Sequence, residues 1–165
     1  MTLTLVRPTG HVIYKTNNLA DGFIPDSQIS ASIDVVNADY ASCGISFHLA
    51  GTDRTLNGDW FDALAPNRQV NSSYGFLPTV VDVTFRSTLQ TAMKTQLRQG
   101  GADALNVYSV GFATGAAAGY LGYSTFPTSY ASNPKDDGVV ILYSSVPGGT
   151  RVPYDKGRTL THEAG

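Results

Sequence analysis

The spacing of apolar residues predicts one amphipathic helix in the N-terminal part of the chain. Four residues recur at intervals of four, three and four positions, which places them on one helical face; they are Ile29, Ile33, Val36 and Tyr40. Asp26 and Ser27 follow Pro25, and either side chain is suited to capping the first turn. We therefore expect a helix of about four turns that packs one face against the rest of the fold.

Several other segments have patterns that are typical of strands. Between Ile45 and Leu49, apolar residues alternate with Ser46 and His48, which predicts a half-buried strand with Phe47 on its inner face. Short β-rich runs predict further strands over residues 11–14, 104–112, 123–126 and 138–143. A stretch rich in Gly and Ala precedes the 123–126 strand, which we expect at an edge of the sheet.

The remaining segments predict helices and turns between these strands. Helical spacing over residues 89–97 stops at Gly100 and Gly101, residues 59–64 predict a short helical turn, and a further helix begins at Arg158. Residues 51–54 are interpreted as a turn and residues 80–85 as a β-like run. Helices among strands indicate an α/β (α+β) domain, in which the 26–40 helix packs on one sheet with the strands near 45–50, 105–112 and 138–143.

Composition and charge exclude several classes of protein. The chain has 165 residues, of which 42% are hydrophobic and 15% charged, with a net charge of −2. This composition argues against disorder, and the scattered Lys and Arg argue against a nucleic-acid-binding surface. The longest apolar run, residues 139–143, is far shorter than the ~20 residues that cross a bilayer, so no membrane partner is expected. Residues 1–8 do not resemble a signal peptide.

One cysteine and three histidines limit the candidate chemistry. Cys43 cannot form a disulfide within the chain, so we expect it to be a small buried residue; a partner in sequence not shown is the alternative. His48 is interpreted as a histidine on the surface of its strand, and His11 as structural. No G-x-S-x-G elbow and no glycine-rich phosphate loop is present in the sequence.

His162 and Glu163 form a more informative pair, because Glu163 is the only glutamate and follows a histidine in a helix-compatible stretch. In the H-E-x-x-H motif, two histidines four residues apart hold Zn²⁺ and the intervening Glu takes a proton from the metal-bound water. The sequence ends at Gly165, one residue before the second histidine would occur. Alone, a His-Glu pair is a weak signal, since it often arises by chance.

Five blocks of sequence, in order and covering most of the chain from His11 onward, strengthen this interpretation. They closely resemble the pappalysin-like (cytophagalysin) family of metzincin zinc metalloproteases, above all fungal extracellular metalloproteases. The blocks are residues 44–55 with 59–61, residues 92–94 with 97–108, residues 119–127, residues 136–149 and residues 161–165. The resemblance therefore extends far beyond the His-Glu pair.

The resemblance implies a zinc endopeptidase with a metzincin-like N-terminal subdomain, in which a twisted mixed sheet is backed by a helix and followed by the start of the active-site helix. It assigns His162 as the first Zn²⁺ ligand and Glu163 as the general base, in a zinc site that this chain leaves incomplete. It also implies a secreted, monomeric protein acting on proteins or peptides. The residues implied to bind substrate along the edge strand are Tyr120, Leu121, Gly122, Tyr123, Ser124 and Thr125.

Three features depart from the family pattern. Residues 1–10 do not look like family sequence, residues 67–87 are interpreted as an insertion or a gene-model artefact, and the chain stops inside the zinc motif. We therefore expect residues 1–165 to be a single, C-terminally truncated catalytic domain that is inactive by itself. The alternative is a non-catalytic remnant or peptide-binding module that retains the metzincin sheet.

Overall fold

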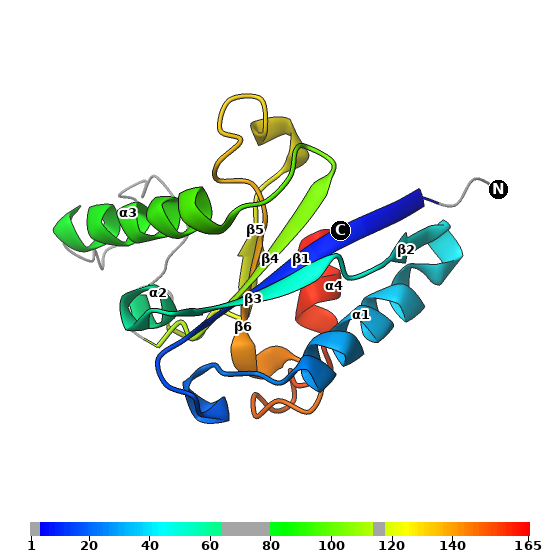
Figure 1. The fold of residues 1–165 in the computed structure, drawn as a ribbon, viewed down its shortest axis with the longest axis horizontal. Helices are drawn as coiled ribbons and strands as arrows, with labels where there is room; N and C mark the ends of the chain where they lie inside the picture. The colour runs from blue at the N-terminus through cyan, green and yellow to red at the C-terminus, as the bar shows by residue number, and fades with distance from the viewer. Residues whose placement is uncertain (1–3, 64–79, 114–117) are drawn as a thin grey trace.

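A mixed sheet of six strands lies at the centre of the computed structural model, which describes residues 4–63, 80–113 and 118–165. The strand order is β2-β1-β4-β6-β5, and β3 lies beside β1 (Figure 1). The strands are β1 (Thr4–Tyr14), β2 (Ile45–Phe47), β3 (Gly51–Leu56), β4 (Ala104–Val110), β5 (Gly122–Ser124) and β6 (Val139–Leu142).

The long first strand organises the sheet. Strand β1 pairs in parallel with β2 through its first residues, with β3 through its last residues and with β4 on its other side. Strand β6 continues the parallel arrangement beyond β4, and β5 closes the sheet as an antiparallel edge strand. The predicted edge position of this strand is confirmed, although the strand runs from Gly122 to Ser124 and not over residues 123–126.

Helices cover both faces of the sheet (Figure 1). One face packs against α1 (Asp26–Tyr40) and α4 (Arg158–Ala164), and the other packs against α2 (Gly58–Ala63) and α3 (Val80–Leu97). Neighbouring strand residues alternate between the two cores: Val12 and Val107 face the first, whereas Ile13 and Tyr108 face the second. The strands are therefore apolar on both sides, as is usual where helices cover both faces.

The expected arrangement of the first helix on the sheet is confirmed. Helix α1 covers residues 26–40 as predicted, and its buried residues include Ile29 and Val36. The three strands expected beneath it belong to one sheet. The predicted capping is wrong, because Pro25 occupies the N-cap position without a side-chain cap, and the carboxylate of Asp26 pairs instead with Arg54 at 2.6 Å.

Two local assignments were wrong because pairing and helix propagation override local sequence preference. Residues 51–54, expected to form a turn, begin strand β3 and pair with residues 9–12 of β1. Residues 80–85, expected to be β-like, form the first turns of α3. Of the segment interpreted as an insertion, residues 67–79 lie outside the described residues.

The extent of three other predicted features also differs. Strand β1 begins at Thr4, seven positions before the predicted start at His11, because it finds partners on both sides. Strand β2 ends at Phe47, and Leu49 is exposed beyond it. Cys43 is exposed and free, so its predicted burial is wrong: it lies in the 3-10 turn Ala41–Cys43 that links α1 to β2.

Candidate active site

Helix α4, which carries the His-Glu pair, is held in place by the end of α1. A helix of seven residues is too short to be stable alone, so its tertiary contacts determine its position. Asp39 pairs with Arg158 at 3.2 Å and accepts a hydrogen bond of 2.6 Å from the Thr161 hydroxyl. The Tyr40 hydroxyl donates to the Thr161 carbonyl at 3.0 Å, and Leu160 is buried in the core.

The two residues of the pair differ in their surroundings. His162 is exposed, whereas Glu163 is half-buried and lies against the edge strand. A Cβ atom placed on Gly122 would lie 3.0 Å from Cγ and 3.1 Å from Oε1 of Glu163. It would also lie 2.9 Å from the carbonyl oxygen of Val140. The missing side chain of Gly122 therefore leaves the space that Glu163 occupies beside β5.

Two open hollows meet at Glu163. One is lined by residues that include Leu121, Tyr154, His162 and Glu163. The other is lined by residues that include Thr125, which follows β5, and Glu163. The carboxylate thus lies at the border between α4 and the edge strand, with solvent-accessible space on both sides.

The six residues expected to bind substrate lie in and around β5. Gly122, Tyr123 and Ser124 form the strand itself. Leu121 precedes it and accepts a backbone hydrogen bond of 2.7 Å from Leu142, while Tyr120 packs against the core. Thr125 follows the strand, and its hydroxyl accepts a bond of 3.1 Å from the Gly138 N–H. Strand β5 ends the sheet, so its outer edge has no strand partner among the described residues.

The donor set around His162 does not by itself make a zinc site. No group of three or more His, Cys, Asp or Glu side chains suited to a metal occurs in the part of the chain that the structure describes. A zinc ion in a protein takes three or four protein ligands. His162 therefore needs further donors before it can hold Zn²⁺ tightly.

The other two histidines do not supply these donors. His11 is fully buried, with Nδ1 2.7 Å from Asp53 Oδ2 and Nε2 2.9 Å from Asn106 Oδ1. Its ring also stacks on Tyr108, with 4.7 Å between centroids. The interpretation of His11 as structural is confirmed. His48 is exposed, one position beyond the end of β2.

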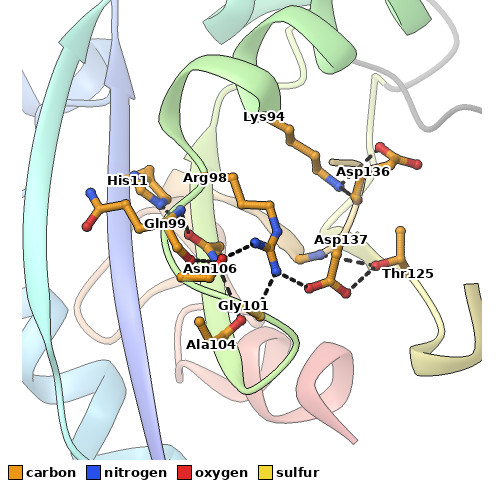
Figure 2. Close-up of polar contacts among 12 residues, drawn as sticks. His11, Lys94, Arg98, Gln99, Gly101, Ala104, Asn106, Thr125, Asp136 and Asp137 are labelled. Atoms are coloured by element: carbon orange, nitrogen blue, oxygen red, sulfur yellow. Dashed lines mark hydrogen bonds and ion pairs between the residues drawn. The ribbon is translucent and has the colours of Figure 1, made fainter. Parts of the chain in front are cut away.

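Sequence reasoning missed a row of polar side chains on α3. Gln90, Lys94 and Arg98 occur at intervals of four and contact the connection between β5 and β6; Figure 2 shows the last two with their partners Asp136 and Asp137. Their spacing was the available signal, because residues four apart share a helical face. The prediction of a helix over residues 89–97 rested on other positions of α3.

The chain is similar to fungal extracellular metalloproteases over nearly its whole length. It is 39% identical to Extracellular metalloprotease 1 of Coccidioides posadasii over 158 residues, which cover 94% of this chain and 47% of that protein. It is 36% identical to an extracellular metalloprotease of Colletotrichum graminicola over 98% of this chain and 49% of that protein. The resemblance inferred from the sequence is therefore confirmed, and the chain is a relative of these proteins.

The fold is similar to that of mirolysin. One mirolysin structure matches with a TM-score of 0.63 and 26% identity, covering 99% of this chain and 62% of that chain. Mature mirolysin of Tannerella forsythia, in complex with a cleaved peptide, matches with a TM-score of 0.66 and 24% identity over the same shares. The predicted metzincin-like α+β fold is thereby confirmed.

The matches cover only part of each relative. The chain spans about half the length of the curated relatives it matches. No family model matches the chain. Within residues 4–63, 80–113 and 118–165, no helix combines the length and hydropathy that crossing a membrane requires.

Proposed function

We propose that this chain is the part of a zinc-dependent endopeptidase that carries the first metal ligand, His162, and the general base, Glu163. The observation that carries the proposal is the contact between the Glu163 side chain and the edge strand at Gly122. A carboxylate in this position lies beside any peptide that pairs with β5. The family resemblance and the names of the fungal relatives support the same assignment.

The substrate in this proposal is an extended segment of a protein or peptide. Such a segment adds to β5 as a further strand, and main-chain hydrogen bonds to the edge provide affinity without strict sequence specificity. Residues 120–125 are proposed to form this binding edge. We further propose that residues 1–165 act as one unit in a secreted, monomeric enzyme, since the relatives are named extracellular.

Glu163 has the chemistry that peptide hydrolysis requires of a base. Its carboxylate is proposed to take a proton from the attacking water and to return it to the departing amine. Enzymes of this class activate that water on a bound metal ion. The proposal requires two ligands in addition to His162, from outside the described residues.

A peptide-binding module without catalysis is the second candidate function. The outer edge of β5 favours it, because this edge has no strand partner among the described residues and needs no metal to bind a peptide. Binding without hydrolysis would then be the activity of the whole protein.

Zinc content and proteolysis, measured on two forms of the protein, test the proposal. The first form is the 165-residue chain, and the second is extended after Gly165 by the sequence that follows the corresponding position in the Coccidioides posadasii relative. We expect the first to lose zinc on dialysis and to leave casein intact, and the second to retain one zinc ion and cleave casein. An extended chain that holds zinc without cleaving would support the binding module.

A matched pair of variants assigns the metal ligand. In the extended chain, His162→Gln should release the zinc ion, whereas His48→Gln should retain it, because His48 is an exposed histidine that lies just beyond β2 and outside α4. Equal zinc content in both variants would contradict the assignment of His162.

Residues 67–87 are still proposed to be an added segment. Replacing residues 67–79 with a short Gly/Ser linker leaves α3 in place and should keep the melting temperature unchanged. Loss of soluble protein would show that the segment is integral to the fold.

A further inference from the structure

Side chains on one face of α3 contact the connection between β5 and β6. Gln90, Lys94 and Arg98 lie one helical turn apart, and all three contact Asp136 or Asp137. Asp136 and Asp137 are the last residues before Gly138, which precedes β6. We call these three helix residues the α3 clamp.

Lys94 is the most unusual member of the clamp, because its side chain is 0% exposed. Its ammonium donates a hydrogen bond of 2.5 Å to the Asp136 carbonyl and lies 3.5 Å from Oδ1 of the same residue (Figure 2). It also lies 5.8 Å from the ring centroid of Tyr108 and 5.9 Å from that of Tyr123. Burying an ammonium is costly even when it is paired, and an apolar side chain often serves stability equally well. The contacts of Lys94 join α3 to Tyr108 of β4, to Tyr123 of β5 and to the β5–β6 connection.

Gln90 extends the clamp directly to the edge strand. Its side-chain N–H donates to the carboxylate of Asp136, and its side-chain carbonyl accepts a bond of 2.6 Å from the Tyr123 hydroxyl. Gln90 is itself 1% exposed, so both contacts are shielded from water. A single side chain therefore ties β5 to the β5–β6 connection.

Arg98 fixes the end of that connection. Its guanidinium lies 3.0 Å from the Asp137 carboxylate and stacks on Tyr130 at 5.4 Å from the ring centroid. The Thr125 hydroxyl in turn lies 3.4 Å from Asp137 and accepts a hydrogen bond from the Gly138 N–H, which ties the two ends of the connection together. Arg98 thus holds Asp137 directly, and Asp137 and Gly138 in turn bond to Thr125, the residue that follows β5.

The alternation of side chains along β5 connects this clamp with Glu163. Tyr123 points to the α3 face, where the clamp holds it, and the neighbouring Gly122 lies against Glu163 on the α4 face. We propose that Gln90 and Lys94 are positioning residues, which act through Tyr123 and Asp136 to hold the peptide-binding edge at its place beside Glu163. This inference rests on the proposed function for its catalytic consequence.

The first test is hydrogen exchange in the 165-residue chain, with three variants. Lys94→Met removes the ammonium but keeps most of the volume, and Tyr123→Phe removes only the hydroxyl bound by Gln90. Gln96→Met is the matched control, since Gln96 is exposed on the same helix. We expect the amide of Thr125, bonded to the Gly138 carbonyl, to exchange on the order of tenfold faster in the first two variants and unchanged in the control.

A fourth variant separates placement of the strand from loss of stability. Ile29→Val removes a methylene group from the opposite core and should leave the exchange of Thr125 unchanged under native conditions. If Lys94→Met does not fold, Tyr123→Phe decides. If either Lys94→Met or Tyr123→Phe folds and leaves the exchange rate of the Thr125 amide unchanged, the inference is overturned.

The second test is peptide hydrolysis by the extended chain. Loosening the edge weakens the binding of substrate and transition state alike, so KM should rise about tenfold while kcat changes by less than about twofold. An active extended chain in which the clamp variants leave KM unchanged would overturn the catalytic part of the inference. Inactivity of the unaltered extended chain would instead contradict the proposed function, and hydrogen exchange would still decide whether the clamp places the strand.

Discussion

Helices α3 and α4 approach the same edge strand from opposite faces, and their polar side chains behave in opposite ways. On α3, Gln90 and Lys94 are buried, and each has close hydrogen-bond partners. On α4, His162 is exposed and has no hydrogen-bond partner among the described residues, while Glu163 borders two open hollows. The α3 side is therefore suited to holding β5, and the α4 side is suited to chemistry beside it.

The contrast shows how structural and chemically available polar groups can be told apart. A buried polar group with satisfied hydrogen bonds fixes geometry, and losing one partner leaves the other unpaired. A group that can bind a metal or move a proton must remain accessible. The same test separates His11, which is buried and bonded at both ring nitrogens, from His162.

The largest effect on stability is expected for Lys94→Ala. The substitution removes a buried ammonium, empties its space and leaves Asp136 without its cation, so the free energy of unfolding should fall by about 3–5 kcal/mol. Urea unfolding measures the loss. Lys156→Ala, at a lysine whose side chain is 73% exposed, should change the value by less than about 0.5 kcal/mol. If both variants lose the same free energy of unfolding, the buried Lys94 contributes no more to stability than an exposed lysine.

A smaller effect is expected for Gly122→Ala, on the face toward α4. The added methyl group meets Glu163 and the Val140 carbonyl, so the strand or the carboxylate must shift at a cost of about 1–3 kcal/mol. In the extended chain, the same variant should lower kcat/KM. Gly51→Ala is the matched control on β3, because its Cβ would meet nothing within 4 Å. Identical behaviour of the two variants would contradict the close contact between Gly122 and Glu163.

The pH dependence of stability tests the burial of Lys94. Burial lowers the pKa of Lys94 from its ordinary 10.5, and Asp136 only partly opposes this effect. The unfolded chain then binds the proton more tightly, so the free energy of unfolding rises as pH increases from the folded pKa toward 10.5. The gain is about 1.4 kcal/mol for each pH unit between the two pKa values.

A matched variant isolates this contribution. Burial raises the pKa of Tyr108 and Tyr123, so their contribution to stability falls above pH ~10 as the unfolded chain ionises first. Both tyrosines remain in Lys94→Met. The free energy of unfolding of the wild type should therefore rise relative to that of the variant as pH increases. A difference that is constant with pH would show that Lys94 titrates alike in both states.

The smallest effect is expected for Cys43→Ser. Because Cys43 is exposed and free, the substitution should change the free energy of unfolding by less than about 0.5 kcal/mol. A thiol reagent should modify one cysteine in the folded chain without denaturant. Slow modification would show that this turn is covered.

The sequence allowed prediction of elements whose own periodicity defines a buried face. Ile29 and Val36 predicted α1, and the apolar run of residues 139–143 predicted β6. Features that depend on distant partners could not be predicted in this way. The pairing of residues 51–54 with β1 and the helical state of residues 80–85 are set by neighbours and by helix propagation.

The resemblance to a family proposes residues for the candidate site, but the sequence does not contain the geometry of the site. His162 and Glu163 could be named from the resemblance to a family. The close approach of Glu163 to Gly122 depends on the packing of α4 against β5, which no local pattern contains. The buried position of Lys94 was missed for a similar reason, since lysine is almost never buried unless it has a partner, and that partner is 42 positions away in the sequence.

Hydrolysis of casein by the extended chain with Glu163→Gln is the most direct test of the proposal that Glu163 is the general base. We expect kcat/KM to fall on the order of 10³-fold while one zinc ion stays bound and the melting temperature is unchanged, because the base is lost and the ligands remain. Retention of most of the activity by this zinc-loaded variant would contradict the assignment of Glu163 as the base beside the edge strand.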